Sequence, residues 1–69
     1  MHEQDEKEIQ RLERLIEGES ICVRRYTEAA QQAETEQTAD WFLKRANAAQ
    51  KRLDKLSAEL DELLQKEVQ

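Results

Sequence analysis

The chain has 69 residues and a net charge of −5, with 39% charged and only 4% aromatic side chains. A chain this short forms at most one domain and buries a smaller share of its surface than a larger protein, so we expect it to associate with a partner or with itself. The negative charge argues against binding to nucleic acid or to an anionic membrane, and no apolar run reaches the roughly 20 residues of a membrane span or resembles a signal peptide, so we expect a cytoplasmic protein.

The first predicted helix covers about residues 4–33. Inward-facing positions recur there at alternating steps of three and four residues, which is the spacing of a helical seam. The seam positions are Ile9, Leu12, Ile16, Glu19, Val23, Tyr26, Ala30 and Ala33. Leu15, Cys22 and Ala29 widen this stripe on one flank beyond what a two-stranded coiled coil uses, which favours contact with more than one helix.

A change of phase predicts a turn at about residues 34–38. The next seam position would be Gln37, which is polar, and the surrounding residues are polar too. Thr35 or Thr38 is suited to cap a new helix. Because the segment lacks glycine and proline, one continuous helix with a stutter in its repeat is the alternative.

The second predicted helix covers about residues 39–67, with seam positions at Ala39, Phe42, Ala46, Ala49, Leu53, Leu56, Leu60 and Leu63. The two seams are complementary in size when residues whose numbers sum to about 72 face each other. The resulting pairs are Ala30 with Phe42, Tyr26 with Ala46, Val23 with Ala49, Ile16 with Leu56, Leu12 with Leu60 and Ile9 with Leu63. We therefore predict an all-α fold, a single antiparallel two-helix hairpin over residues 1–69.

Glu19 is the one charged residue at a seam position. In the paired hairpin it faces Leu53, and Arg52 lies on the flank of the same seam. A buried carboxylate without a partner costs several kcal/mol or takes up a proton. We therefore predict a buried polar pair, in which Glu19 is held by Arg52 or by the Tyr26 hydroxyl of a neighbouring chain.

The motif Gly18-Glu19-Ser20 is followed by Arg25-Tyr26-Thr27, by alanines at 30 and 33, by Phe42-Leu43 and by Ala46. Over about residues 15–56 this pattern resembles the first helical hairpin of rubrerythrin and related ferritin-like proteins. In that family a glutamate of the first helix binds a di-iron centre, a tyrosine seven residues later packs beside it, and the second helix supplies Glu-x-x-His. Glu19 and Tyr26 match the first helix, whereas Ala49 and Arg52 stand at the Glu-x-x-His positions. The resemblance thus implies the fold, half of a four-helix bundle, more than the metal chemistry.

The sequence does not predict an enzyme or a cofactor, because it contains no recognisable nucleophile, general base or phosphate-binding loop. A metal-binding protein is one alternative, in which an oligomer gathers copies of Glu19, helped by Glu17. His2 falls in a terminal segment that we expect to be frayed and solvated. We expect Cys22 to pack as a small apolar group rather than to react.

We predict a non-enzymatic, self-associating hairpin that serves as an interaction or structural module. It forms a homodimer or a higher homo-oligomer, with two hairpins making a four-helix bundle. The predicted interface residues are Leu12, Leu15, Ile16, Cys22, Trp41, Leu43 and Leu64. A further alternative is a small adaptor, co-chaperone or inhibitor that binds another protein through its apolar flank.

The sequence allows two interpretations for each of two surface features. Basic residues gather near mid-length, at Arg24, Arg25, Lys44, Arg45, Lys51 and Arg52. They either keep the surface solvated or form a docking patch for an acidic partner. Trp41 stands just off the seam beside Phe42, where it either caps the core or anchors a partner protein.

Overall fold

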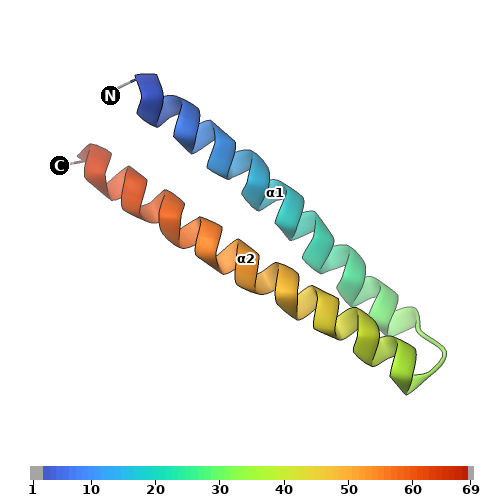
Figure 1. Cartoon of the computed structure of the whole chain (residues 1–69). Coiled ribbons are helices and arrows are strands. Elements are labelled where there is room, and N and C mark those ends of the chain that lie inside the picture. The colour runs from blue at the N-terminus through green and yellow to red at the C-terminus, as the bar shows by residue number, and fades with distance from the viewer. Residues whose placement is uncertain (1–2, 69) are drawn as a thin grey trace.

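The computed structural model describes residues 3–68, and the side chains of residues 3–66. This part of the chain consists of two helices, α1 (Glu3–Gln32) and α2 (Glu36–Val68). They run antiparallel and side by side, so that the first turn of α1 and the last turn of α2 lie at the same end of a rod (Figure 1). The rod measures 51 × 15 × 12 Å along its principal axes. The predicted all-α two-helix hairpin is therefore confirmed.

The first two turns of α1 are stabilised by their charges. Glu3, Asp5 and Glu6 lie in the first turn, where carboxylates interact favourably with the positive end of the helix dipole. One turn further on, Arg11 Nε donates a hydrogen bond to Glu8 Oε2 at 3.1 Å. This hydrogen bond lowers the pKa of Glu8. Such pairs three residues apart support an exposed helix face.

The turn between the helices comprises residues 33–35 and is shorter than the predicted 34–38. Thr35 is the N-cap of α2, because its hydroxyl accepts a hydrogen bond from the backbone N–H of Thr38 at 3.2 Å. The backbone N–H of Ala39 then donates to the carbonyl of Thr35 at 3.0 Å. The helix thus begins at Glu36 rather than near 39, since polar residues 36–38 form its exposed first turn.

The turn does not need a glycine. No residue in the described part of the chain has a positive φ angle, and left-handed backbone is the main reason for a turn to require glycine. The absence of glycine and proline from this segment therefore does not oppose a reversal of the chain, and the continuous helix is not what the structure adopts.

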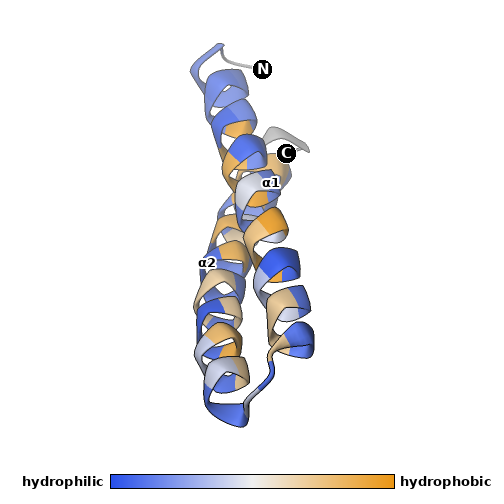
Figure 2. Cartoon of the chain, turned by 90° about the vertical axis from the view of Figure 1, so that its right-hand side faces the viewer, coloured by the Kyte–Doolittle hydropathy of each residue, from blue (hydrophilic) through white to orange (hydrophobic). Residues whose placement is uncertain are grey.

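The core is a thin line along the contact between the helices. In the described part of the chain, the buried apolar residues are Leu12, Ala30, Ala46 and Ala49, with exposed fractions of 2%, 8%, 5% and 0%. The three alanines lie in the half of the rod nearer the turn, and Leu12 lies in the open half. Figure 2 shows apolar residues distributed along both helices rather than gathered in a globular centre. A single hairpin therefore has little core for its length.

In the described residues, neither helix is both long enough and apolar enough to cross a lipid bilayer.

Candidate functional site

Glu19 on α1 and Arg52 on α2 connect the two helices near the middle of the rod. Arg52 Nε donates a hydrogen bond to Glu19 Oε1 at 3.0 Å. This bond is the main cause of the raised pKa of Arg52, to which Coulombic interactions with Cys22 and Tyr26 add smaller contributions. The contact brings together residues 33 positions apart in the chain.

The pair is not buried, contrary to the expectation for a charge in the seam. The Glu19 side chain is 21% exposed and that of Arg52 is 57% exposed. Arginine has a long aliphatic stem, so its guanidinium group reaches the carboxylate from the solvated flank. An ion pair this accessible is screened by water and contributes little to stability.

One oxygen of the Glu19 carboxylate has no hydrogen-bond partner among the described residues. Glu19 Oε2 is buried and accepts no hydrogen bond from any described residue. The Tyr26 hydroxyl of the same chain does not reach it, and the Tyr26 ring instead packs against Phe42 with the ring centroids 6.4 Å apart. A buried acceptor without a donor costs about 1–3 kcal/mol. The site therefore combines a weak attraction with a desolvation penalty.

The geometry around Glu19 offers few metal ligands. Among the described residues, no three His, Cys, Asp or Glu side chains come together as a ligand set. Ala49, at the first of the Glu-x-x-His positions, is fully buried and has no donor atom. Arg52 holds one oxygen of Glu19, and Glu17 is exposed. His2 lies outside the described residues.

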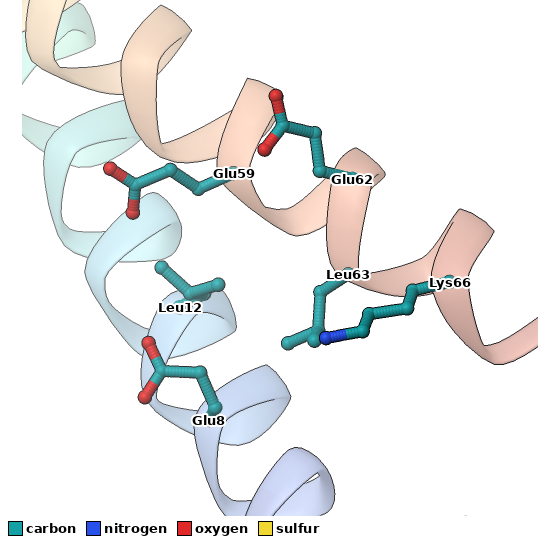
Figure 3. Close-up of a pocket in the computed structure, with 6 residues that line it drawn as sticks. All are labelled: Glu8, Leu12, Glu59, Glu62, Leu63 and Lys66. Atoms are coloured by element: carbon teal, nitrogen blue, oxygen red, sulfur yellow. The ribbon is translucent and has the colours of Figure 1, made fainter.

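Two hollows lie along the seam, and one of them is lined by Glu19. One, of about 260 Å³, is lined by Glu8, Leu12, Glu59, Glu62, Leu63 and Lys66 (Figure 3). The other, of about 350 Å³, is lined by Arg11, Glu19, Arg52, Lys55, Leu56 and Glu59. Glu59 lines both, so the two hollows open on the same side of the hairpin. The first hollow has three carboxylates and one ammonium group around its two leucine side chains, and Figure 3 shows how these residues lie.

Within residues 3–66, four large apolar side chains are exposed on the rod. Leu15, Trp41, Leu43 and Leu64 have exposed fractions of 41%, 50%, 44% and 42%. All four are among the predicted interface residues. Of the other three, Leu12 is 2% exposed, and Ile16 and Cys22 are intermediate. Leu12 is thus covered by its own hairpin and offers no surface to a partner, because it faces α2 in the seam.

The exposed leucines lie on opposite sides of the hairpin. Each seam consists of pairs of positions three residues apart, such as Ile16 and Glu19. The residue just before a pair lies on one flank of the seam, and the residue just after the pair lies on the other flank. Leu15 and Cys22 precede such pairs, as does Arg52, whereas Leu43 and Leu64 follow them. In an antiparallel pair the preceding flanks of both helices face the same side, and the influence of Cys22 on Arg52 agrees with this.

We call the two faces the Arg52 side and the Leu43 side. A single partner packed against one of them covers only that one, so one hairpin–hairpin contact does not cover Leu15 and Leu43 together. The prediction from the sequence treated these leucines as one interface. The position of each leucine before or after a seam pair already indicates on which side of the hairpin it lies.

Trp41 lies near the turn on the Arg52 side. Its ring meets that of Phe42 edge to face, with centroids 5.0 Å apart and an interplanar angle of 82°. The Arg45 guanidinium lies over the Trp41 ring, 4.1 Å from its centroid, within the range of a cation–π interaction. Gln37, Thr38, Trp41 and Phe42 line a hollow of about 440 Å³ at this end. Trp41 therefore combines contact with the core and an exposed surface.

Comparison with protein-family models, with curated proteins and with solved structures finds no match to this chain. The structure is a two-helix hairpin with extensive contact between its helices, which is consistent with half of a four-helix bundle. That is the part of the ferritin-like resemblance that the structure supports, and no match supports the family itself. The class defined by the fold is that of the antiparallel helical hairpins.

Proposed function

We propose that the chain is a non-enzymatic, self-associating helical hairpin that acts as an interaction or structural module. The observation that carries the proposal is the exposure of large apolar side chains on a rod with a thin core. Among the residues whose side chains the structure describes, four form the buried apolar core, and four large apolar side chains are exposed. Packing two hairpins together adds buried apolar area, which is the usual remedy for a chain of this size.

Sedimentation of the full chain tests this proposal. We expect a species larger than the 8.2 kDa monomer at tens of micromolar, because apolar contact drives association as concentration rises. Leu15→Gln and Leu43→Gln remove one exposed leucine from each side, and at least one of them should shift the equilibrium towards monomer. Gln31→Ala, at an exposed polar position of α1, is the matched control. A single 8.2 kDa species at all concentrations would contradict the proposal.

A second candidate function, binding of a different protein, is favoured by Trp41. Exposed tryptophan and arginine side chains are common anchors of protein interfaces, and here Arg45 stacks on Trp41 beside a hollow. The candidates differ in one measurement: Trp41→Ala should leave self-association unchanged if Trp41 serves a different partner.

A further inference from the structure

From the middle of the rod towards the turn, the Arg52 side of the hairpin divides lengthwise into an apolar strip and a charged strip, whereas Glu8 occupies the same flank of α1 nearer the open end. On α1, the flank residues that precede seam pairs around the middle of the helix are Leu15, Cys22 and Ala29. On α2, the corresponding residues are Arg45, Arg52, Glu59 and Lys66. Leu15 is 41% exposed, and the hollow lined by Arg11 and Glu19 flanks it, because residues four apart share one face of a helix.

A second copy can meet this side with twofold symmetry in two ways. A twofold axis along the rods places α1 of one copy against α2 of the other, so the apolar strip meets charged residues. A twofold axis across the rods places α1 against α1 and α2 against α2, so the apolar strip meets itself. The second arrangement packs Leu15 of each copy against the apolar strip of the other copy, whereas the first packs it against charged residues of α2.

We propose that the Arg52 side binds a second copy of this chain with the two rods antiparallel, the turn of one beside the open end of the other. This inference rests on the proposed self-association. It specifies which surface the two copies share, how the two rods are oriented and which residues face each other. The apolar strips coincide when Leu15 of one copy lies opposite Cys22 of the second copy. The twofold axis then passes beside Gly18, close to the middle of α1, and the rods overlap over almost their whole length.

Gly18 agrees with this register. Within the hairpin, a Cβ atom added at Gly18 would meet nothing within 4 Å, and its φ angle is not positive. Nothing in the part of the chain that the structure describes therefore requires a glycine at this mid-helix position, where glycine is a poorer helix former than alanine. At the axis, α1 of one copy crosses α1 of the other at its nearest point, and the missing side chain permits a close approach of the backbones.

The charges along the rod support the antiparallel orientation. Residues 20–53, the half nearer the turn, carry six basic and four acidic side chains and have a net charge of +2. The remaining residues carry five basic and twelve acidic side chains and have a net charge of −7. Antiparallel rods place the two unlike halves against each other, whereas parallel rods place the two acidic halves together.

The same register pairs specific charges on α2. The Glu19–Arg52 contact shows that the middle of α1 is level with residues near 53 on α2. Arg45 and Glu62 lie at equal distances on either side of that level, so Arg45 of one copy lies opposite Glu62 of the second copy. By the same rule Arg52, whose charge is already paired with Glu19, lies opposite Lys55 of the second copy. Within one helix these residues are about 25 Å apart, so any direct coupling between them comes from a second copy.

Disulfide formation in the Leu15→Cys variant of the full chain tests the register. Positions 15 and 22 of one helix are about 10 Å apart along its axis, beyond the reach of a disulfide. A disulfide between the cysteine introduced at position 15 and the native Cys22, identified by peptide mapping after mild oxidation, is therefore intermolecular. We expect it to be the main product, with Leu43→Cys as the matched control on the opposite side. Equal cross-linking of both variants, or dimers without the link between positions 15 and 22, would overturn the inference.

A charge-reversal cycle tests the orientation without a cysteine. Arg45→Glu and Glu62→Arg should each raise the dissociation constant of the dimer by about fivefold, since each breaks two symmetric pairs. The double variant should return it to within about twofold of the original value. If the protein dimerises but the effects of the two substitutions on the dissociation free energy simply add in the double variant, the proposed orientation is wrong and self-association still holds. A chain that stays monomeric in all variants and in the original sequence would overturn the proposed function itself.

Discussion

Glu19 shows how a single polar residue in an apolar seam is tolerated. Its Oε1 accepts a hydrogen bond from Arg52, whereas its Oε2 is buried and has no partner in the described part of the chain. The exposed guanidinium limits the gain from the first contact, and the buried oxygen adds a penalty. The two effects oppose each other, so this pair contributes little net stability to the hairpin.

Replacing the pair by apolar residues should therefore not weaken the hairpin. We expect Glu19→Leu to raise the free energy of unfolding by about 1 kcal/mol, because it removes the unpaired oxygen and adds apolar contact in the seam. Glu19→Leu combined with Arg52→Leu should be at least as stable as the original sequence. Urea unfolding followed by circular dichroism, at one fixed protein concentration, measures both.

Arg52→Ala alone should instead lower the melting temperature, since it leaves the whole Glu19 carboxylate in the seam without a partner. Lys44→Ala, at an exposed basic position of the same helix, is the control and should have little effect. If the variant carrying both Glu19→Leu and Arg52→Leu were less stable than Arg52→Ala, the attraction within the ion pair would outweigh the cost of desolvating Glu19.

At the scale of the helices, the start of α2 depends on one side chain. The Thr35 hydroxyl accepts a hydrogen bond from the Thr38 N–H and donates one to the Thr38 hydroxyl at 2.9 Å. The first of these satisfies a backbone donor that has no partner within the helix. The cap therefore fixes where the chain stops turning and α2 begins.

Removal of this cap gives a direct measurement of its contribution. We expect Thr35→Ala to lower the free energy of unfolding by about 1 kcal/mol, measured by thermal unfolding. Thr35→Ser keeps the hydroxyl and should remain close to the original stability. Thr38→Ala keeps the capping acceptor and should do the same; a larger loss for Thr38→Ala than for Thr35→Ala would contradict this account of the turn.

The seam repeat was enough to predict two antiparallel helices, because alternating steps of three and four residues define a helix face. It misplaced the turn, since the repeat reports which residues face the other helix and not which are helical. Gln37 and Thr38 interrupt the seam but belong to the exposed first turn of α2. A capping argument applied to Thr35 alone would have placed the helix start correctly.

Exposure at the candidate site was harder to predict than proximity. The pairing of the seams brings Arg52 near Glu19, but it does not say from which direction a long side chain approaches. Arg52 approaches from the flank and keeps more than half of its side chain in water. Leu12 was likewise wrongly expected at the interface with a partner. It was chosen because it is apolar, although its position in the seam already implied that α2 buries it.

For the whole molecule, the length of the rod distinguishes modes of association. A single hairpin is 51 Å long. Antiparallel packing on the Arg52 side should widen the particle and leave its longest dimension nearly unchanged, because the proposed register overlaps the rods almost completely. Association end to end, through the exposed surface near Trp41, would lengthen it. The maximum dimension from small-angle X-ray scattering, compared between dilute and concentrated samples, separates these cases.

Leu15→Gln provides the control for the scattering measurement, since it should keep the dimensions of a single hairpin at concentrations where the original sequence has widened. Particles that lengthen on concentration would contradict side-by-side packing.

The start of α1 and the end of α2 lie at the same end of the rod (Figure 1), and this has a mechanical consequence. A force that pulls Glu3 and Val68 apart acts across the helix contact rather than along it, so it separates the facing residues one level after another, starting at the open end. Each step breaks only a few contacts, and the hairpin peels open at a low force. The same two helices pulled from opposite ends would have to slide past each other and break all of their contacts at once.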